Sequence, residues 1–401
     1  MHSTMRVEVD VKSRGGQPLD ETAPTGYTDS MDSDAARPLD TISEPSRVAV
    51  DDEGIGPDEL GLAARNHGMP LEAMRWDVTP IGLHYLLTHY DIPAVDDTSW
   101  RLDVSGLVDV GLSLTLDDLR ARQSVSHTVT MECAGNGRAR LLPRPISQPW
   151  LHEAVGTMRW TGTPLAALLR EAGLDPRASD VVFTGLDHGV ERGVEQRYQR
   201  GLSLDDALRD EVLLAYECNG APLPPQHGFP LRLLVPGWYG MTSVKWLSSI
   251  EVVDTPFDGY QMRAYRLRQE SGEPGEALSR IDPRALVVPP GSPDFMSRRR
   301  FLRAGTVVLE GRAWSGWGEV SRVEVSTDGG GSWREAEVEP AVGPHAWRRW
   351  TLGWEATPGE YVVAARATDA TGRSQPADQP WNRGGFANTS TQRVEVLVLP
   401  T

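Results

Sequence analysis

Apolar and polar positions alternate over several short segments of the chain. In TSWRLDVSGLVD (98–109), polar residues separate Trp100, Leu102 and Val104, and this alternation predicts a half-buried strand. TPLAALLREAGL (163–174) has apolar positions at helical spacing between a Thr-Pro start and a Gly stop, which predicts a helix. The same reasoning predicts strands at 127–133, 180–187, 211–220, 230–237 and 243–254, and short helices at 59–65, 113–122 and 203–210.

The helix expected at 113–122 has a recognisable start. Thr115 stands at the N-cap position and Asp118 follows three residues later, an arrangement related to the capping box. Helices and strands are mixed in this part of the chain without a regular βαβ alternation. We therefore expect an α+β fold rather than a doubly wound parallel sheet.

The pattern changes after about residue 275. Residues 273–294 are rich in Pro and Gly and are interpreted as an interdomain linker. Only strand signals follow, and in YVVAARA the side chains of Tyr361, Val363 and Ala365 face one way, as in an immunoglobulin-like sandwich. We expect three parts: an acidic, mostly disordered tail (1–58), an α+β domain (59–275) and an all-β, immunoglobulin-like domain (276–401).

The 401 residues carry a net charge of −16, which argues against nucleic-acid binding, because that function needs a basic stripe. The basic run SRRRFLR (297–303) is interpreted as a solvated face or linker. No apolar run approaches the ~18 residues of a membrane-spanning helix. The first thirty residues show neither an apolar signal segment nor a twin arginine, so we expect a cytoplasmic protein, or a periplasmic one if a leader has been removed.

Cys133 ends a predicted strand in HTVTMECAGNGRAR (127–140), directly before a turn of small residues. The chain has only two cysteines, too few for a disulfide framework, and no Cys-x-x-Cys zinc or haem pattern. Arg138 and Arg140 follow, and neighbouring cations favour a thiolate, which is both a nucleophile and a soft metal ligand.

Three interpretations of Cys133 are open on these residues alone. It is a small buried apolar residue, or a nucleophile, or a metal ligand. A nucleophile needs a histidine base, for which the candidates are His89, His127 and His227. A zinc site is disfavoured, because nothing supplies further ligands at the required spacing.

ECAGNGR (132–138) resembles the cysteine motif of the sulfite oxidase family of molybdenum enzymes. Five other segments are similar to that family in order and spacing: 84–93, 183–189, 213–237, 237–247 and 379–396. The resemblance extends from about residue 60 to the C terminus. It implies a sulfite-oxidase-type molybdopterin-binding domain of α+β class, followed by an immunoglobulin-like dimerisation domain, and therefore a homodimer.

The resemblance also implies roles for individual residues. Cys133 would bind molybdenum through its thiolate, and the pterin dithiolene would supply two further sulfurs. Arg138 would bind an oxyanion substrate, and Tyr265 would hydrogen-bond an oxo ligand or assist proton release. Cofactor contacts are implied for Tyr85, His89, Asp187, His227, Arg232, Ser243 and Lys245.

Two of these residues, Ser243 and Lys245, lie two positions apart, and we expect them to project from one face of a strand. Cys218, where the family has an apolar residue, is expected to be an inert core residue. The chain departs from the family at Leu87, Gly137 and Thr242, where relatives often have arginine. Fewer cations weaken oxyanion binding, unless other arginines of the chain compensate: Arg263, Arg266 or Arg268.

The resemblance implies oxidation of sulfite to sulfate by oxo transfer, with the electrons passing to a separate acceptor. No haem is expected in this chain. Two alternatives stay open: reduction of another substrate on the same fold, such as nitrate or an organic sulfoxide, and a cofactor-free binding protein that acts through its β-sandwich.

Overall fold

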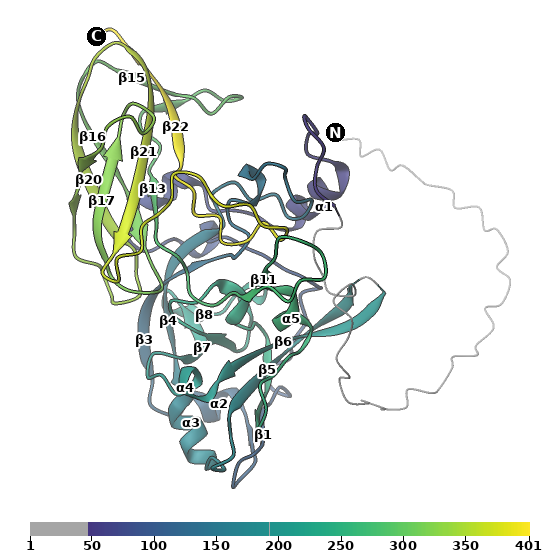
Figure 1. Cartoon of the computed structure of the whole chain (residues 1–401). Coiled ribbons are helices and arrows are strands. Elements are labelled where there is room, and N and C mark those ends of the chain that lie inside the picture. The colour runs from purple at the N-terminus through teal and green to yellow at the C-terminus, as the bar shows by residue number, and fades with distance from the viewer. Residues whose placement is uncertain (1–46, 192) are drawn as a thin grey trace, which may run out of the picture. The chain divides into compact units, whose positions relative to one another are not determined.

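The computed structural model describes residues 47–191 and 193–401. Its α-helices are short and few among many strands (Figure 1). The α-helices are α1 (Pro57–Arg65), α2 (Leu116–Arg120), α3 (Leu165–Ala172), α4 (Leu204–Ala207) and α5 (Tyr260–Ala264).

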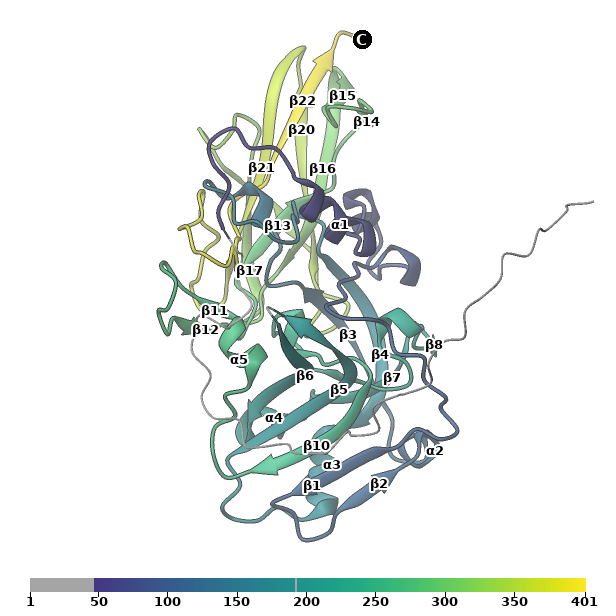
Figure 2. The ribbon, with the colours of Figure 1, turned by 90° about the vertical axis from the view of Figure 1, so that its right-hand side faces the viewer.

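The first half of the chain contains two sheets. One has the order β2-β1-β10-β5-β6 (Figure 2), and the other the order β3-β4-β7-β8, with β9 also paired to β7. Only β1 and β10 pair in parallel within them, so the domain is of α+β class, as predicted. The strands of the two sheets are β1 (Leu102–Gly106), β2 (Leu112–Leu114), β3 (Val125–Glu132), β4 (Val155–Pro164), β5 (Asp180–Glu191), β6 (Val194–Ser203), β7 (Leu213–Cys218), β8 (Ala221–Pro222), β9 (Arg232–Leu234) and β10 (Leu247–Val253).

One apolar core joins these two sheets. Leu102 of β1 and Phe183 of β5 share a cluster of buried side chains with Leu233 of β9, and Leu168 of α3 packs into it. Trp100, Leu102 and Val104 are all buried, as their alternation with polar residues predicted. The core therefore holds the strand ends that carry the site in fixed positions.

The C-terminal part of the chain, from β13 onward, is a β-sandwich of a four-stranded and a six-stranded sheet, with the orders β13-β16-β20-β19 and β14-β15-β22-β21-β17-β18. Its core includes Trp350 of β20 facing Val363 and Ala365 of β21, which confirms the predicted inward face. The strands, preceded by the small hairpin of β11 (Arg266–Leu267) and β12 (Glu276–Ala277), are β13 (Arg284–Val287), β14 (Ser292–Pro293), β15 (Arg300–Arg303), β16 (Gly305–Trp314), β17 (Val320–Ser326), β18 (Arg334–Glu335), β19 (Glu337–Val338), β20 (Arg348–Ala356), β21 (Gly359–Asp369) and β22 (Arg393–Leu399).

The sandwich packs directly on the α+β domain. A shared apolar cluster contains Met74 and Ala134 from the first domain and Trp314, Trp347 and Phe386 from the second. A buried guanidinium adds a polar contact, because Arg312 of β16 donates to the backbone carbonyl of Met74 at 2.7 Å. The two domains are therefore continuous in packing as well as in sequence.

Local signals predicted several elements correctly. Thr115 Oγ1 accepts from the backbone N–H of Asp118 at 3.0 Å, and the Asp118 carboxylate accepts from the backbone N–H of Thr115 at 2.9 Å, so α2 begins with a capping box. Helix α3 ends before Gly173, whose φ of 73° is the left-handed conformation expected of a stop.

Three expectations were wrong in part. The strand predicted at 243–254 begins only at Leu247, so Ser243 and Lys245 lie in the loop before it and not on one strand face. The predicted linker at 273–294 contains β13, which is fully buried because it pairs with β16. In the predicted tail at 1–58, residues 1–46 lie outside the described part, but Ala49 is buried and its N–H donates to the Arg144 carbonyl at 2.7 Å.

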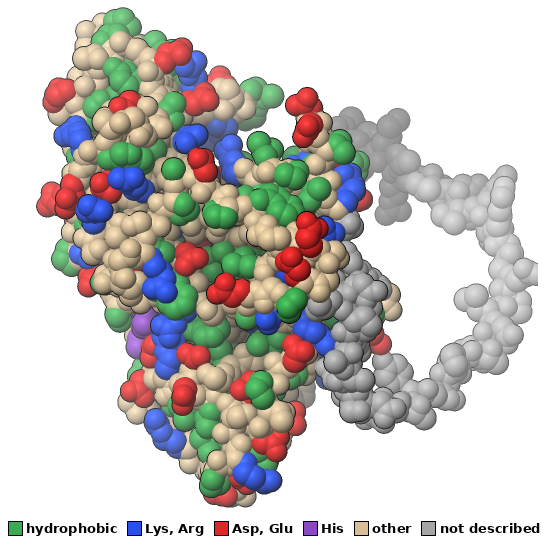
Figure 3. All heavy atoms as spheres, in the orientation of Figure 1, with side chains coloured by type: hydrophobic (Ala, Val, Ile, Leu, Met, Phe, Trp, Pro, Cys, Tyr) green, Lys and Arg blue, Asp and Glu red, His purple; other side chains and the backbone are tan. Residues whose placement is uncertain are grey.

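On the face in Figure 3, the acidic and basic groups of the described residues are interspersed. The basic run at 297–303 forms ion pairs, since Arg299 contacts Glu360 at 2.9 Å and Arg300 contacts Glu72 at 3.1 Å. Among the described residues, no helix is long and apolar enough to cross a membrane.

Candidate active site

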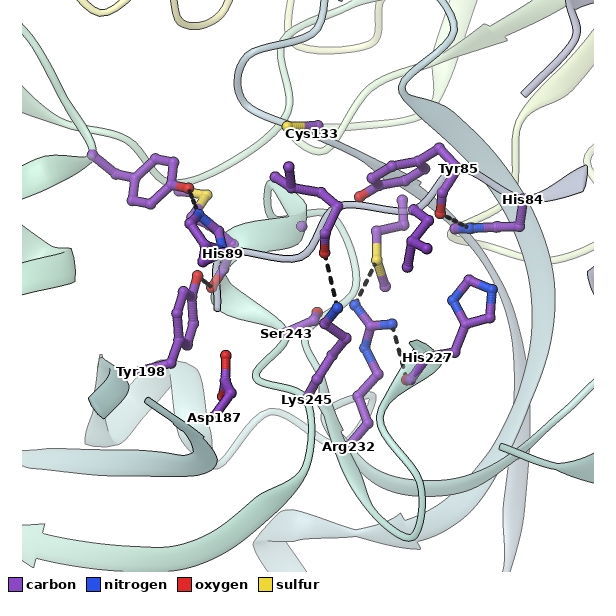
Figure 4. Close-up of a pocket in the computed structure, with 16 residues that line it drawn as sticks. His84, Tyr85, His89, Cys133, Asp187, Tyr198, His227, Arg232, Ser243 and Lys245 are labelled. Carbon is purple, nitrogen blue, oxygen red and sulfur yellow. Dashed lines mark hydrogen bonds between the residues drawn. The ribbon is translucent and has the colours of Figure 1, made fainter. Parts of the chain in front are cut away.

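A cavity lies where the loops after several strands of the α+β domain meet (Figure 4). Its lining includes nine of the ten residues predicted for the site: Tyr85, His89, Cys133, Asp187, His227, Arg232, Ser243, Lys245 and Tyr265. The tenth, Arg138, lines a second cavity, which shares Leu87, His89, Cys133 and Tyr265 with the first. The predicted residues are therefore brought together, with Cys133 where the two cavities adjoin.

Cys133 directly follows β3 and is held by its backbone. Its N–H donates to the Ala154 carbonyl at 2.9 Å, and its own carbonyl accepts from the Asn136 N–H at 3.0 Å. Burial raises the pKa of the thiol above its ordinary value, while the nearby Arg138 guanidinium opposes that shift. The thiolate would therefore need a further stabilising group, such as a bound cation, in order to form at this position.

Arg232, on β9, is a buried cation without a counter-ion. Its Nη2 contacts the Met131 sulfur at 3.1 Å and its Nη1 the His227 carbonyl at a long 3.4 Å, while Nε has no partner. The guanidinium lies 5.1 Å from the Trp160 ring. Among the described residues, no carboxylate pairs with it, and burial lowers its pKa to about 10. Such a group is expected where an anion binds.

Lys245 is the second buried cation of this cavity. Its ammonium donates only to backbone carbonyls, those of Leu87 at 2.8 Å and Gln226 at 3.3 Å. Burial lowers its pKa to about 7, and burial raises the pKa of the neighbouring Asp187 to about 6. One carboxylate oxygen of Asp187, Oδ1, is buried without a partner, so it can accept a hydrogen bond from a ligand.

The histidines and Ser243 occupy the remaining wall. His84 Nδ1 donates to the Tyr85 carbonyl at 2.9 Å, and its ring lies edge-on to His227 with centroids 5.5 Å apart. Burial lowers the pKa of His84 to about 4 and that of His227 to about 2, so both rings are neutral near pH 7. The Ser243 hydroxyl accepts from the Val235 N–H at 3.1 Å and braces the loop before β10.

His89 and Tyr265 mark the junction of the two cavities. His89 Nε2 and the Tyr265 hydroxyl share a hydrogen bond of 2.6 Å. Burial lowers the pKa of His89 to about 4 and raises that of Tyr265 well above its usual range. At neutral pH the imidazole and the phenol are therefore both uncharged. One proton lies in the hydrogen bond between them, beside Cys133.

Arg138 presents one free edge of its guanidinium. Nε donates to the Gly384 carbonyl at 2.9 Å and Nη1 to the Gln148 carbonyl at 3.0 Å, while Nη2 makes no hydrogen bond to a described residue. The group lies over Gly135, where a Cβ atom would be 2.7 Å from Nη2. Glycine at 135 thus allows the cation to lie against the backbone of the turn that follows Cys133.

The three positions that lack the family's arginine are filled in different ways. Gly137 has φ +91°, and a Cβ there would lie 2.8 Å from the Asn388 carbonyl oxygen, so no side chain fits. Leu87 offers its carbonyl to Lys245, and Thr242 is fully buried. The expected compensation is wrong, because none of the candidate arginines lines either cavity: Arg263, Arg266 and Arg268.

Some residues of the site were not predicted from the sequence. His84 and Tyr198 line the first cavity, and Gln148 and Trp150 line the second. His84 stands next to the predicted Tyr85 in the quoted HYLLTH stretch, so its position was available, but a histidine beside a site residue is often only structural. Of the three histidines proposed as bases, His127 lies outside both cavities, near His345. Cys218, predicted to be an inert core residue, is fully buried.

Comparison with known proteins explains why these residues gather. Residues 89–261 match the oxidoreductase molybdopterin binding domain, and residues 277–398 match the Mo-co oxidoreductase dimerisation domain. The chain belongs to the sulfite oxidase family of molybdopterin oxidoreductases. Within this family the mitochondrial sulfite oxidase of Rattus norvegicus is 34% identical over 341 residues, 80% of this chain and 62% of that protein.

Other members of the family act on different substrates. The NAD(P)H nitrate reductase of Hordeum vulgare is 30% identical over 357 residues, 80% of this chain and 39% of that protein. A crystal structure of the sulfane dehydrogenase SoxCD from Paracoccus pantotrophus covers 93% of this chain and 94% of its own, with a TM-score of 0.72 and 25% identity. The chain thus spans less than two thirds of the length of these curated relatives, and its two folded parts match the molybdopterin-binding and dimerisation domains of the family.

The first cavity fits such a cofactor in its donor set. Two buried cations, Arg232 and Lys245, form no salt bridge with a carboxylate of the described residues and suit a phosphate-bearing pterin, and the free Asp187 oxygen suits its amine groups. Among the described residues, no group of three or more His, Cys, Asp or Glu could hold a metal ion. A metal at Cys133 would therefore take most of its ligands from the cofactor.

Proposed function

We propose that this protein oxidises sulfite to sulfate by oxygen-atom transfer at a molybdenum centre bound to Cys133. The observation that carries the proposal is the junction of the two cavities. Cys133, His89 and Tyr265 line both, and the free edge of Arg138 lines the second. A cofactor in the first cavity and an oxyanion in the second would therefore meet beside the thiol.

The bound cofactor supplies two-electron oxygen-atom transfer chemistry. The chain supplies its position and charge. Arg232 and Lys245 would bind the phosphate of the pterin, because no side-chain anion of the described residues neutralises Arg232 and only Asp187 lies near Lys245. Asp187 would accept from an N–H of the ring system, and the Cys133 thiolate would bind the metal.

On the substrate side, Arg138 would hold an oxyanion through Nη2, since its other nitrogens are already hydrogen-bonded. Its position is fixed by those two carbonyls and by the Phe386 ring, 5.2 Å away. The Tyr265–His89 pair would hold a proton next to the reacting atoms. Each sulfite oxidised gains one oxygen, which water ultimately supplies with release of two protons, and loses two electrons, which we propose pass to a separate acceptor. The absence of haem stays a prediction.

Reduction of an organic sulfoxide is the second candidate, favoured by the lining of the second cavity. Arg138 is its one cationic side chain among the described residues. Glu191 adds one carboxylate, and much of the remaining wall is apolar or amide: Leu62, Ile146, Trp150, Phe386, Asn66, Gln148 and Gln261. A single cation beside apolar walls also suits a neutral substrate with an organic substituent.

A steady-state assay separates the two candidates. Protein shown to contain molybdenum is mixed with sulfite and an artificial one-electron acceptor, and in parallel with dimethyl sulfoxide and a reduced viologen. We expect turnover of sulfite, and a rise of about tenfold in KM for sulfite in Arg138→Met, because one charge-assisted contact is lost. Molybdenum-loaded protein that turns over only the sulfoxide would overturn the sulfite assignment.

We also propose that the protein is a homodimer, because residues 277–398 match a dimerisation domain. Light scattering of the full chain should then give a mass near 88.0 kDa, twice the 44.0 kDa of one chain. A mass of 44.0 kDa at micromolar concentration would contradict this assembly. The cytoplasmic location stays a prediction.

A further inference from the structure

The loop that carries Cys133 contacts the C-terminal β-domain as well as its own domain. We define the cysteine loop as residues 132–140 and the C-terminal loop as residues 382–388, which precede β22 (yellow in Figure 1). Three hydrogen bonds join the two loops. The Ala387 N–H donates to the Ala134 carbonyl at 2.8 Å, Asn388 Nδ2 donates to the Gly137 carbonyl at 2.7 Å, and Arg138 donates to the Gly384 carbonyl.

A buried ion pair joins the same loop to the sandwich itself. Glu132, the residue before Cys133, pairs with Arg284 of β13, and each side chain is only 1% exposed. The second carboxylate oxygen accepts from the Trp314 indole N–H at 2.8 Å, at the end of β16. Asn136 completes the set from within the cysteine loop, donating to Glu132 at 2.9 Å. Both carboxylate oxygens are therefore satisfied, mostly by the second domain.

The C-terminal loop is itself braced and reaches the reacting groups. Asn382 closes it with two hydrogen bonds, to the Phe386 carbonyl at 2.8 Å and from the Phe386 N–H at 2.9 Å. The Phe386 ring lies 5.2 Å from the Tyr265 ring, and it also packs against Arg138. Displacement of this loop would thus move the thiol-bearing loop, the tyrosine and the substrate arginine together.

We propose that the C-terminal domain has a second role beside dimerisation: through Arg284, Asn388 and the C-terminal loop it positions Cys133 for the metal. This inference rests on the proposed function, because it takes Cys133 as the metal ligand. Arg284 and Asn388 are positioning residues, since neither lines the two cavities. A cysteine that is the sole protein ligand depends on such support, because no other side chain would hold the metal in place.

The test compares two buried arginines of the sandwich that both contact the first domain. Arg284 supports the cysteine loop, whereas Arg312 donates to the carbonyls of Met74 and Arg75, away from that loop. Arg284→Met, Arg284→Lys, Asn388→Ala and Arg312→Met are prepared as full-length, molybdenum-loaded protein in a Cys218→Ala background. Three quantities are measured for each: molybdenum retained during dialysis, the rate of alkylation of Cys133 by iodoacetamide, and the melting temperature.

We expect Arg284→Met and Asn388→Ala to lose molybdenum and to expose Cys133 to alkylation about tenfold faster than the parent, as is usual when outer support of a metal ligand is removed. Arg284→Lys should restore part of the retention. Arg312→Met should lower the melting temperature without either change. If Arg284→Met does not fold, Asn388→Ala, which loses one hydrogen bond, decides alone.

The outcomes separate the two claims. A parent protein that never carries molybdenum contradicts the proposed function. A parent that retains it, with Arg284→Met and Asn388→Ala retaining it equally well, or losing it no faster than Arg312→Met, overturns the positioning role and leaves the proposed function intact.

Discussion

Two buried arginines of this chain differ in whether a carboxylate faces them. Arg284 pairs with Glu132, whereas Arg232 has only a sulfur, a distant carbonyl and an aromatic ring around it. An unpaired buried cation destabilises a fold, because the lost hydration is not replaced. Its presence in the cavity indicates that the fold keeps this unfavourable group for an anionic ligand.

Replacing these two arginines should therefore change stability in opposite directions. In cofactor-free protein, Arg232→Met should raise the free energy of unfolding by about 1–3 kcal/mol, because an uncompensated charge is removed. Arg284→Met should lower it by about 3–5 kcal/mol, because Glu132 loses its partner. Urea unfolding measures both, and molybdenum analysis should show that Arg232→Met no longer retains the cofactor. A stable, fully loaded Arg232→Met protein would show that Arg232 has no part in cofactor binding.

Lys245 gives a pH dependence of stability with a defined sign. Its pKa falls from 10.5 to about 7 on folding, so between these values the unfolded chain binds a proton that the folded chain does not. The free energy of unfolding of cofactor-free protein should rise with pH across this window. Asp187 acts at lower pH: its pKa rises from 3.8 to about 6, so stability falls as pH rises between those two values.

Urea titrations between pH 7 and 9.5 test the lysine contribution, and the matched variant is Lys245→Met. We expect the parent to gain stability over this range and the variant to gain clearly less, because the variant has no proton to release. Equal slopes for the two proteins would mean that Lys245 is not desolvated in the folded state.

At the scale of elements, the turn between β3 and the short helix at Arg138–Arg140 is shaped by its contact with the second domain. Gly137 combines a left-handed φ of 91° with a neighbour that leaves no room for a side chain. Its carbonyl is also hydrogen-bonded by Asn388. A side chain at this position would therefore collide with the second domain.

Gly137→Ala should destabilise the protein more than Gly372→Ala. Both positions have a positive φ, which costs an alanine about 1–2 kcal/mol. Nothing lies within 4 Å of a Cβ at Gly372, whereas a Cβ at Gly137 would meet the Asn388 carbonyl at 2.8 Å. Melting temperatures of the two variants compare these costs, and equal losses would show that the C-terminal domain does not close over this turn.

The elements that local sequence specifies were predicted well, and those set by distant contacts were not. Thr115 and Asp118 cap α2 through bonds three residues apart, so the signal is in the sequence itself. Ser243 and Lys245 looked like strand positions, but Trp246 has φ 49° and the strand begins after it. That turn is fixed by partners far away, such as the Leu87 carbonyl on Lys245, which no local pattern reveals.

The same distinction holds for the site. Motif resemblance selected ten residues that the fold brings to two adjoining cavities, but it did not predict which domain holds them. The pairing of Glu132 with Arg284 joins positions 152 residues apart. The stretch 273–294, interpreted as a linker, contains β13, the strand that carries this arginine. The local sequence did not reveal this strand, because its partner β16 comes later in the chain.

At the scale of the whole molecule, two domains meet at the proposed cofactor site. The α+β domain supplies Cys133 and the cations of the first cavity, and the sandwich supplies Arg284, Phe386 and the C-terminal loop. We therefore expect that cofactor binding stabilises the contact between the domains as well as the first domain, because the cysteine loop is common to both.

The central claim is that the Cys133 thiolate is the protein's ligand to molybdenum, and X-ray absorption at the molybdenum edge tests it most directly. The spectrum of the loaded parent is compared with that of loaded Cys133→Ser, with Cys218→Ser as the control. We expect one sulfur ligand fewer at molybdenum in Cys133→Ser and an unchanged number of sulfur ligands in Cys218→Ser. An unchanged sulfur count in a Cys133→Ser protein that still holds molybdenum would contradict it.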